Sequence, residues 1–121
     1  MEINILGTRY SVDIVDKQDD MMSSNNWCGY CDYINKKIVV LKNNEEEHAL
    51  RHEIIHAFLH ESGIKFDLAF HTELCVDWIA TQLPKMNEAL NEVDNICNIE
   101  VQLLTSKEKQ FIKDTVRNNV R

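Results

Sequence analysis

Four histidines recur at every fourth position of one apolar segment: His48, His52, His56 and His60. Residues four apart lie on the same face of an α-helix, about one turn from each other. The middle of the segment, EIIHAFLH, is apolar on nearly all sides, which predicts a helix inside the protein. Because unpaired polar groups are costly there, a fold that contains this histidine ladder must give the imidazole nitrogens partners.

Within the ladder, HEIIH fits the pattern H-E-x-x-H at His52, Glu53 and His56. Two imidazoles one helical turn apart can bind one zinc ion from the same side, and the glutamate can act as general base toward a zinc-activated water. The alternative is a hydrogen-bonded pair of core histidines. A metal is the simplest compensation for three ionisable side chains among apolar neighbours. We therefore predict that His52 and His56 bind zinc and that Glu53 is catalytic.

The outer histidines of the ladder fit this site less well. His52 and His60 are eight residues apart, which is roughly 12 Å along a helix with a rotation of about 80°. One ion cannot readily reach both rings. We interpret His48 and His60 as polar, partly exposed helix positions. The alternative is that His60 hydrogen-bonds to a substrate or to a group behind the ligands.

A hydrolytic zinc site usually has three protein ligands and a water, so a third ligand is needed. The downstream candidates are Asp67, His71, Glu73 and Asp77. Glu73 and Asp77 share one face of a predicted helix, so we predict that Glu73 is the third ligand and that Asp77 accepts a hydrogen bond from the far nitrogen of His52 or His56. His71 is the main rival as ligand. The alternative for both acids is a solvated helix position.

The sequence pattern of the N-terminal third predicts β-strands. Residues 2–6 and 9–15 alternate apolar and polar side chains around Gly7-Thr8, which indicates a hairpin. Residues 16–26 are polar and predict a loop. Two further strands are expected in GYCDYINKKIVVL, with a turn near Asn35-Lys36 and with the apolar run 38–41 covered on both sides.

The rest of the chain predicts helices. The first begins at an N-cap, Asn43 or Asn44, and ends before Gly63; the second covers about 72–83, and Pro84 opens a third, roughly 84–93. Residues 94–104 fit no clear pattern. A capping box at Thr105 and Glu108 opens a last helix, along which Ile112, Val116 and Val120 recur. The fold class is therefore α+β, with a small twisted, mainly antiparallel sheet packed on the H-E-x-x-H helix and a helical C-terminal half.

Length and charge restrict the class of protein. The 121 residues predict one domain, 1–121, rich in strands over 1–42 and in helices over 43–121. A formal net charge of -7 argues against a nucleic-acid partner, and the basic stretch 107–121 is interpreted as a solvated helix face. The N-terminus does not look like a signal peptide, and no apolar run approaches a membrane span. We therefore expect a cytoplasmic protein without a membrane partner and with reduced cysteines.

Other reactive and aromatic side chains have simpler interpretations. Cys28 and Cys31 form a C-x-x-C pair, but Cys75 and Cys97 stand alone, so small apolar positions are preferred over a second metal or redox site. Tyr30 and Tyr33 could stabilise an oxyanion near the zinc, but packing on a strand face is the preferred interpretation. Four further aromatic residues are expected in the core or in a cleft wall: Trp27, Phe66, Phe70 and Trp78.

The segment HEIIHAFLH followed by ELCVDWIATQLP resembles the gluzincin-type zinc metallopeptidases, especially the small ImmA/IrrE-type enzymes and related phage-encoded proteins. The resemblance covers roughly residues 29–85. It implies that Glu73 takes the ligand position, Asp77 the polar position one turn later, Ala80 a small position and Pro84 a helix break. It also implies a zinc site at the open edge of a sheet, where an extended peptide could add to an edge strand.

Two functions follow from these residues. The first is a zinc-dependent metallopeptidase that hydrolyses a cytoplasmic protein or peptide, with Glu53 taking the proton of the zinc-activated water. The alternative is a metallopeptidase-like protein with weak or no catalysis that binds and regulates a host protein. The presence of Glu53 favours the enzyme, because a purely structural zinc site does not need this side chain.

Overall fold

The protein is described here by a computed structural model, which covers residues 1–102 and 113–116. The chain forms two compact units, Met1–Gln82 and Leu83–Arg121. Most of the helix predicted to start at Thr105 lies outside the described residues. The part that is described, residues 113–116, is helical. All the predicted site residues belong to the first unit.

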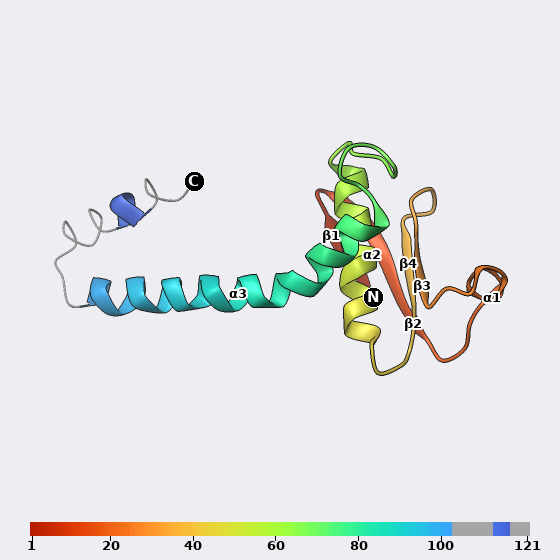
Figure 1. Ribbon diagram of the computed structural model, residues 1–121, viewed down its shortest axis with the longest axis horizontal. Helices are drawn as coiled ribbons and strands as arrows, with labels where there is room; N and C mark the ends of the chain where they lie inside the picture. Colours follow the sequence, from red (N-terminus) through yellow and green to blue (C-terminus); the bar gives the residue numbers. More distant parts are fainter. Residues whose placement is uncertain (103–112, 117–121) are drawn as a thin grey trace. The chain divides into compact units, whose positions relative to one another are not determined.

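The first unit is built on a four-stranded sheet (Figure 1). Its strands, in chain order, are β1 (Glu2–Ile5), β2 (Thr8–Val15), β3 (Gly29–Asp32) and β4 (Lys37–Leu41). The order across the sheet is β1-β2-β4-β3, in which β2 and β4 are parallel and the other two pairs are antiparallel. This mixed, mainly antiparallel sheet confirms the predicted α+β class and both hairpins.

Left-handed residues shape the turns between the strands. Leu6 and Gly7 have φ angles of 51° and 90°, and two positive φ values are what a two-residue type I′ hairpin requires. The first turn is thus Leu6-Gly7, one residue earlier than predicted. In the second hairpin Lys36 has a φ of 54°, which places the turn where the sequence predicted it.

The predicted loop 16–26 is wrong in part, because it contains a short helix, α1 (Asp20–Asn25). The side chain of Asp19 caps this helix by accepting a hydrogen bond of 2.9 Å from the backbone N–H of Met22. Met22 is fully buried, so the helix is also held by packing. The polar composition of the segment hid both features. The hydroxyl of Tyr30 on β3 donates a 2.6 Å hydrogen bond to Asp19, which ties α1 to the sheet.

The histidine ladder lies on α2 (Glu46–Glu61). The predicted N-cap is wrong by one or two residues, because the cap is Glu45. The side chain of Asn43 instead accepts a 2.8 Å hydrogen bond from the backbone N–H of Glu45, in the turn before the helix. The predicted end is confirmed, since α2 stops before Gly63, whose φ of 95° suits the residue that follows a helix.

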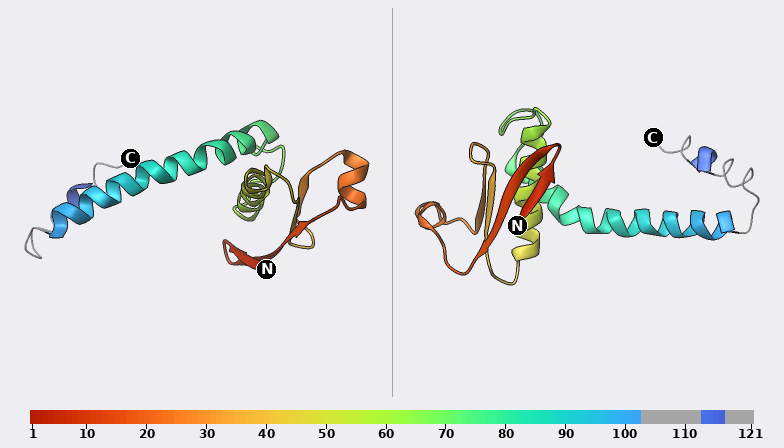
Figure 2. Two further views of the ribbon diagram at one scale, coloured as in Figure 1. Left: turned by 90° about the horizontal axis from the view of Figure 1, so that it is seen from below. Right: turned by 180° about the vertical axis from the view of Figure 1, so that it is seen from behind.

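The α2 helix is the middle layer of the first unit, between the sheet and the first turns of α3 (Glu73–Gln102) (Figure 2, left). Toward the sheet it packs Ala57, Leu50 and Ile54 against the core of β1, β2 and β4. Toward α3 it packs Ile55 against two residues of α3, Val76 and Ala80. This double packing explains why the segment is apolar on nearly all sides.

The predicted helix break at Pro84 is wrong, because α3 continues from Glu73 to Gln102 with Pro84 inside it. A proline has no N–H, so it cannot bond to the carbonyl four residues earlier, which is that of Ala80. Arg51 of α2 donates a 3.1 Å hydrogen bond from Nε to this carbonyl. The replacement donor removes part of the usual penalty for an interior proline.

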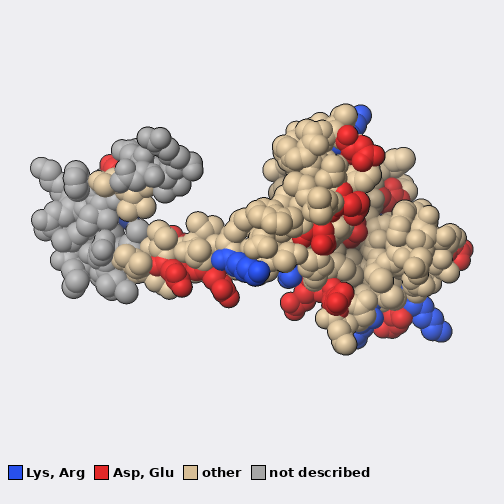
Figure 3. Space-filling model, viewed as in Figure 1, with Lys and Arg blue, Asp and Glu red and all other residues tan. Residues whose placement is uncertain are grey.

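None of the described helices is long and apolar enough to cross a membrane. Acidic side chains are spread over the face of the molecule shown in Figure 3, and basic side chains occupy few places on it. This view agrees with the net charge of -7. It shows no broad basic surface of the kind that phosphate groups require.

Candidate metal centre

The predicted motif residues meet on one side of α2. His52, Glu53 and His56 each offer a ligand atom, and these atoms lie within 4.8 Å of one another. His56 and Glu53 are buried, and His52 is half-buried. The three residues therefore form a group that could hold a metal ion.

Glu73, the predicted third ligand, faces the same two rings from the first residue of α3. Its carboxylate oxygens lie 3.0 Å from Nε2 of His52 and 3.0 Å from Nε2 of His56. The two Nε2 atoms are 3.1 Å apart. The structure thus brings together the two histidines and the glutamate that the sequence singled out.

A hydrogen-bond chain behind His56 fixes which of its nitrogens carries the proton. Nδ1 of His71 lies 2.6 Å from the carbonyl oxygen of Ile64, so this nitrogen must donate. Nε2 of His71 is then an acceptor, and it lies 2.8 Å from Nδ1 of His56. His56 therefore donates from Nδ1, which leaves the lone pair on its Nε2 directed at Glu73 and His52.

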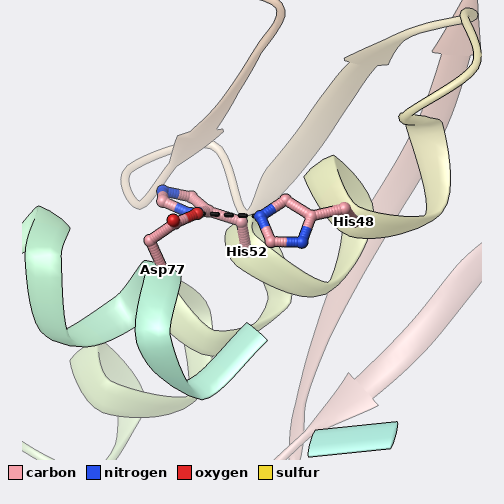
Figure 4. Close-up of side chains that lie close together, drawn as sticks. All are labelled: His48, His52 and Asp77. Atoms are coloured by element: carbon pink, nitrogen blue, oxygen red, sulfur yellow. Dashed lines mark hydrogen bonds and ion pairs between the residues drawn. The ribbon is translucent and has the colours of Figure 1, made fainter. Parts of the chain in front are cut away.

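Asp77 does the same for His52. Its Oδ1 atom lies 3.3 Å from Nδ1 of His52 and 2.8 Å from Nε2 of His48, and Figure 4 shows the carboxylate reaching from α3 toward these rings on α2. The hydrogen bonds from His48 and then His52 hold the pKa of Asp77 below its usual range, so the carboxylate accepts from both rings. His52 therefore donates from Nδ1, and its Nε2 faces Glu73.

With both histidines neutral, two imidazole lone pairs face the carboxylate of Glu73 at the centre. A metal cation, or a proton on one of the Nε2 atoms, would offset the repulsion between these groups. At a zinc–ligand distance of ~2.1 Å, the ligand atoms of a tetrahedral site are about 3.4 Å apart. The observed 3.0–3.1 Å separations are within about 0.4 Å of that value, so small side-chain shifts suffice.

His48, His52 and Asp77 form a second group whose ligand atoms lie within 4.8 Å. This group differs in chemistry, because two N–H donors meet one carboxylate and all three are satisfied by hydrogen bonds. Its geometry is that of a support for His52. His52, His56 and Glu73 are the better candidate for a metal site, because their Nε2 atoms and carboxylate face one another while each Nδ1 atom is already hydrogen-bonded.

Burial changes the proton affinity of the two buried members. Burial, and then the negative charge of Glu73, raise the pKa of Glu53 to about 8. For His56, burial is the main effect and lowers the pKa to about 4. An extra proton on His56 is thus disfavoured at neutral pH, which leaves its lone pair available for a metal ion.

A cleft of about 850 Å³ opens onto this group. Glu53, His56 and Glu73 line one part of it, and Phe66 of the loop after α2 contributes to the wall. The rest of the lining comes from β3, the turn after it, α1 and the residues that follow α1: Met21, Trp27, Gly29, Tyr30, Cys31, Asp32, Tyr33, Ile34 and Asn35. The candidate centre is therefore reachable from solvent along an edge of the sheet.

The outer histidines are both half-buried, as predicted, but each has a contact that the sequence did not reveal. His48 supports Asp77, whereas His60 stacks on Tyr33 with ring centroids 4.3 Å apart. His71, considered only as a rival ligand, lies behind His56 and is fully buried. Asp67, another candidate ligand, is an exposed loop residue with a φ of 66°.

The interpretation of the cysteines is confirmed for Cys31, which packs against the core and whose thiol pKa is raised by burial. Cys28 is exposed, and neither residue is in a disulfide. Among the aromatic residues, Trp27 and Phe66 line the cleft as expected. The expectation is wrong for Phe70 and Trp78, which are more than half exposed and do not line it.

Comparison of the chain with protein-family models, with curated proteins and with solved structures found no match. Any conclusion about function therefore has to come from the side chains of the centre and of the cleft beside it.

Proposed function

We propose that the protein is a zinc-dependent metallopeptidase, with His52, His56 and Glu73 as ligands and Glu53 as general base. One observation carries the proposal: the Nε2 atoms of His52 and His56 and the carboxylate of Glu73 lie within 3.1 Å of one another, while the Nδ1 atom of each ring is hydrogen-bonded elsewhere. Two histidines and one glutamate are a ligand set of catalytic zinc, which leaves a fourth position open. Zinc bound there would supply a Lewis acid that activates water and polarises a peptide carbonyl.

The other side chains prepare this centre. His71 holds His56 through its Nδ1, and Asp77 holds His52 through its Nδ1, so both rings present Nε2 to the same point. Glu53 follows the first ligand on α2 and lines the cleft. Its raised pKa shows that it binds a proton readily in this environment, and the charge of a bound cation would lower that pKa toward neutrality or below. It can therefore take a proton from water and deliver it to the leaving amine.

The edge of the sheet gives the cleft a means of holding a peptide. β3 is an outer strand, and the backbone of Leu41 donates to the carbonyl of Cys28 across the β3–β4 pair. In antiparallel pairing every second residue bonds to the partner strand, so the backbone groups of Gly29 and Cys31 point outward. An extended peptide could pair with these groups and pass the centre, as peptides do at other sheet edges.

The first test is the metal content and activity of the purified protein. We expect about one zinc per chain in the wild type and a large loss of zinc in Glu73→Ala and His52→Ala. Glu53→Gln should keep the zinc and lose hydrolysis of an unfolded test protein such as β-casein. Elemental analysis and the appearance of new peptide termini measure the two properties separately.

Two results would reject the proposal. A wild-type protein that is purified without chelator, contains no zinc and cannot be loaded has no such centre. A Glu53→Gln variant that still cleaves its substrate at the wild-type rate does not use Glu53 as base. If zinc binds but no peptide bond is cut, the alternative of a metallopeptidase-like binding protein takes its place.

A further inference from the structure

The cleft extends well beyond the metal-binding group, along β3 to α1. Cys31 of β3 and Glu53 of α2 both line the cleft. Gly29 and then Trp27 lie two and four residues before Cys31, which is about 7 Å and at most about 13 Å along an extended chain. At about 3.3 Å per residue, the Trp27 part of the cleft is reached by a peptide residue two to four positions, thus about three, from the bond over the centre.

This remote part of the cleft is apolar and open. Met21 of α1 is 48% exposed and Trp27 is 43% exposed, although both are large apolar side chains on the wall of a cavity. The neighbouring Tyr30 is held in place by its hydrogen bond to Asp19, so this wall is fixed to the sheet. Apolar surface of this kind gains free energy when an apolar side chain covers it.

The charges of the cleft narrow the choice of ligand. In the described part of the chain, Asp32, Glu53 and Glu73 line the cleft, whereas no Lys or Arg does. A metal ion would offset Glu73 but not Asp32. Acidic side chains of a peptide are thus repelled, and neutral or basic ones are accepted.

On this basis we propose an apolar specificity subsite formed by Met21 and Trp27, which takes a bulky aliphatic or aromatic side chain about three residues from the scissile bond of an extended peptide without acidic residues nearby. The subsite deepens the proposed peptidase function and rests on it for the scissile bond. Its two residues lie in α1 and just after it, outside both the H-E-x-x-H helix and α3.

The first experiment maps cleavage sites in β-casein by mass spectrometry with the zinc-loaded protein. We expect leucine, isoleucine, phenylalanine and methionine to be enriched about three residues from the cut, on one side. Trp27→Ala should remove this enrichment and slow cleavage at such sites about tenfold, with unchanged zinc content. Met21→Ser should act in the same direction. The matched control is Trp78→Ala, since Trp78 is 57% exposed and does not line the cleft.

The second experiment measures binding without hydrolysis. The chain has two tryptophans, so Glu53→Gln combined with Trp78→Phe leaves Trp27 as the sole tryptophan reporter. We expect a blue shift of its fluorescence when a capped decapeptide of alternating leucine and lysine is added. The same peptide with serine in place of leucine carries equal charge and should give no shift.

The outcomes separate the subsite from the peptidase function. Cleavage with the same site preference in the wild type and in Trp27→Ala, or equal fluorescence responses to the two peptides, overturns the subsite but leaves the peptidase. A blue shift limited to the leucine peptide, in a protein that cuts nothing, supports the subsite and overturns the peptidase.

Discussion

At the residue scale, the candidate centre depends on which imidazole nitrogens carry protons. The carbonyl of Ile64 sets the proton of His71, which sets that of His56, while the carboxylate of Asp77 sets that of His52. Both sets of hydrogen bonds use Nδ1, so each ring, when neutral, has its lone pair on Nε2. The lone pairs are therefore arranged before any ion arrives, which reduces the reorganisation that metal binding requires.

The first prediction concerns His71. His71→Leu should weaken zinc binding about 10- to 100-fold, because His56 loses the acceptor that fixes its tautomer. His71→Gln should retain more affinity, since its amide can both accept and donate. Competition with a chromogenic chelator measures the affinity, and ¹⁵N NMR of the metal-free protein shows whether the proton stays on Nδ1 of His56.

The control for this prediction is His60→Leu. His60 is another half-buried histidine near the cleft, but it takes part in neither the His71–His56 nor the Asp77–His52 hydrogen bonds. It should leave both the affinity and the His56 tautomer unchanged. Equal zinc affinities for His71→Leu and the wild type would contradict the role assigned to His71.

The second prediction follows from the raised pKa of Glu53, about 8 in the folded protein against an ordinary value of 4.5. The folded state holds this proton more tightly, so the stability contribution is complete below about pH 4.5 and is lost as the pH rises through about 8. Without metal, the wild type should lose about 2–4 kcal/mol more unfolding free energy than Glu53→Gln between about pH 5 and pH 9. Urea denaturation in the presence of chelator measures the difference.

The lowered pKa of His56 affects the stability of the folded protein at acidic pH. Its contribution is complete above its ordinary pKa of 6.5 and is lost as the pH falls through about 4. Both variants contain His56, so this loss cancels in the comparison. Parallel pH profiles of the wild type and Glu53→Gln above about pH 6 would show that Glu53 does not titrate as stated.

At the scale of elements, α2 and α3 are joined by more than apolar packing. The side chain of Arg51 on α2 bonds to the carbonyl of Ala80, which Pro84 leaves without its helical donor. An interior proline and an arginine on a different helix are thus linked through one carbonyl group. The linkage explains why α3 continues where a proline predicted a break.

The third prediction tests this linkage by a double-mutant cycle. Arg51→Leu should cost about 1–2 kcal/mol of unfolding free energy, because it leaves the Ala80 carbonyl without a donor. In a Pro84→Ala background the cost should be smaller, since the substituted alanine supplies the missing N–H. Denaturation of the four proteins gives the coupling free energy. Equal costs in the two backgrounds would show that Arg51 and Pro84 act independently.

Much of the order of helices and strands could be predicted from hydrophobic periodicity and from residues typical of turns and helix ends. Alternating residues marked β1 and β2, the ladder with Gly63 marked α2, and the one-turn spacing of Glu73 and Asp77 put both acids on one face of α3. The burial of His71 could not be predicted, because it depends on a loop in which the non-glycine residues Asp67 and Ala69 both adopt positive φ angles. No local preference signals that conformation.

At the scale of the whole molecule, a bound ion should add stability to a fold that does not depend on it. The main core, with Ile5, Tyr10 and Ile38 among its buried members, lies on the sheet side of α2. The candidate metal centre instead involves α2 and α3. We therefore expect the metal-free protein to remain folded.

The fourth prediction is that zinc at a free concentration of 100 times its dissociation constant adds about 2.7 kcal/mol, which raises the unfolding midpoint by about 10 °C. Chelator should reverse the shift. His52→Ala should fold but show no shift with zinc. Circular dichroism with and without zinc measures the midpoints, and a shift of equal size in His52→Ala would place the ion elsewhere.

The donor atoms come from two neighbouring layers, since His52 and His56 belong to α2 and Glu73 to α3. An ion held by all three would act as a reversible cross-link that closes the intervening chain into a ring. Amide hydrogen exchange in the first turns of α3 would then slow when the ion binds, while exchange in the central strands β2 and β4 would change little. Metal supply would in this way set how long the wall of the cleft that carries Glu73 stays in place.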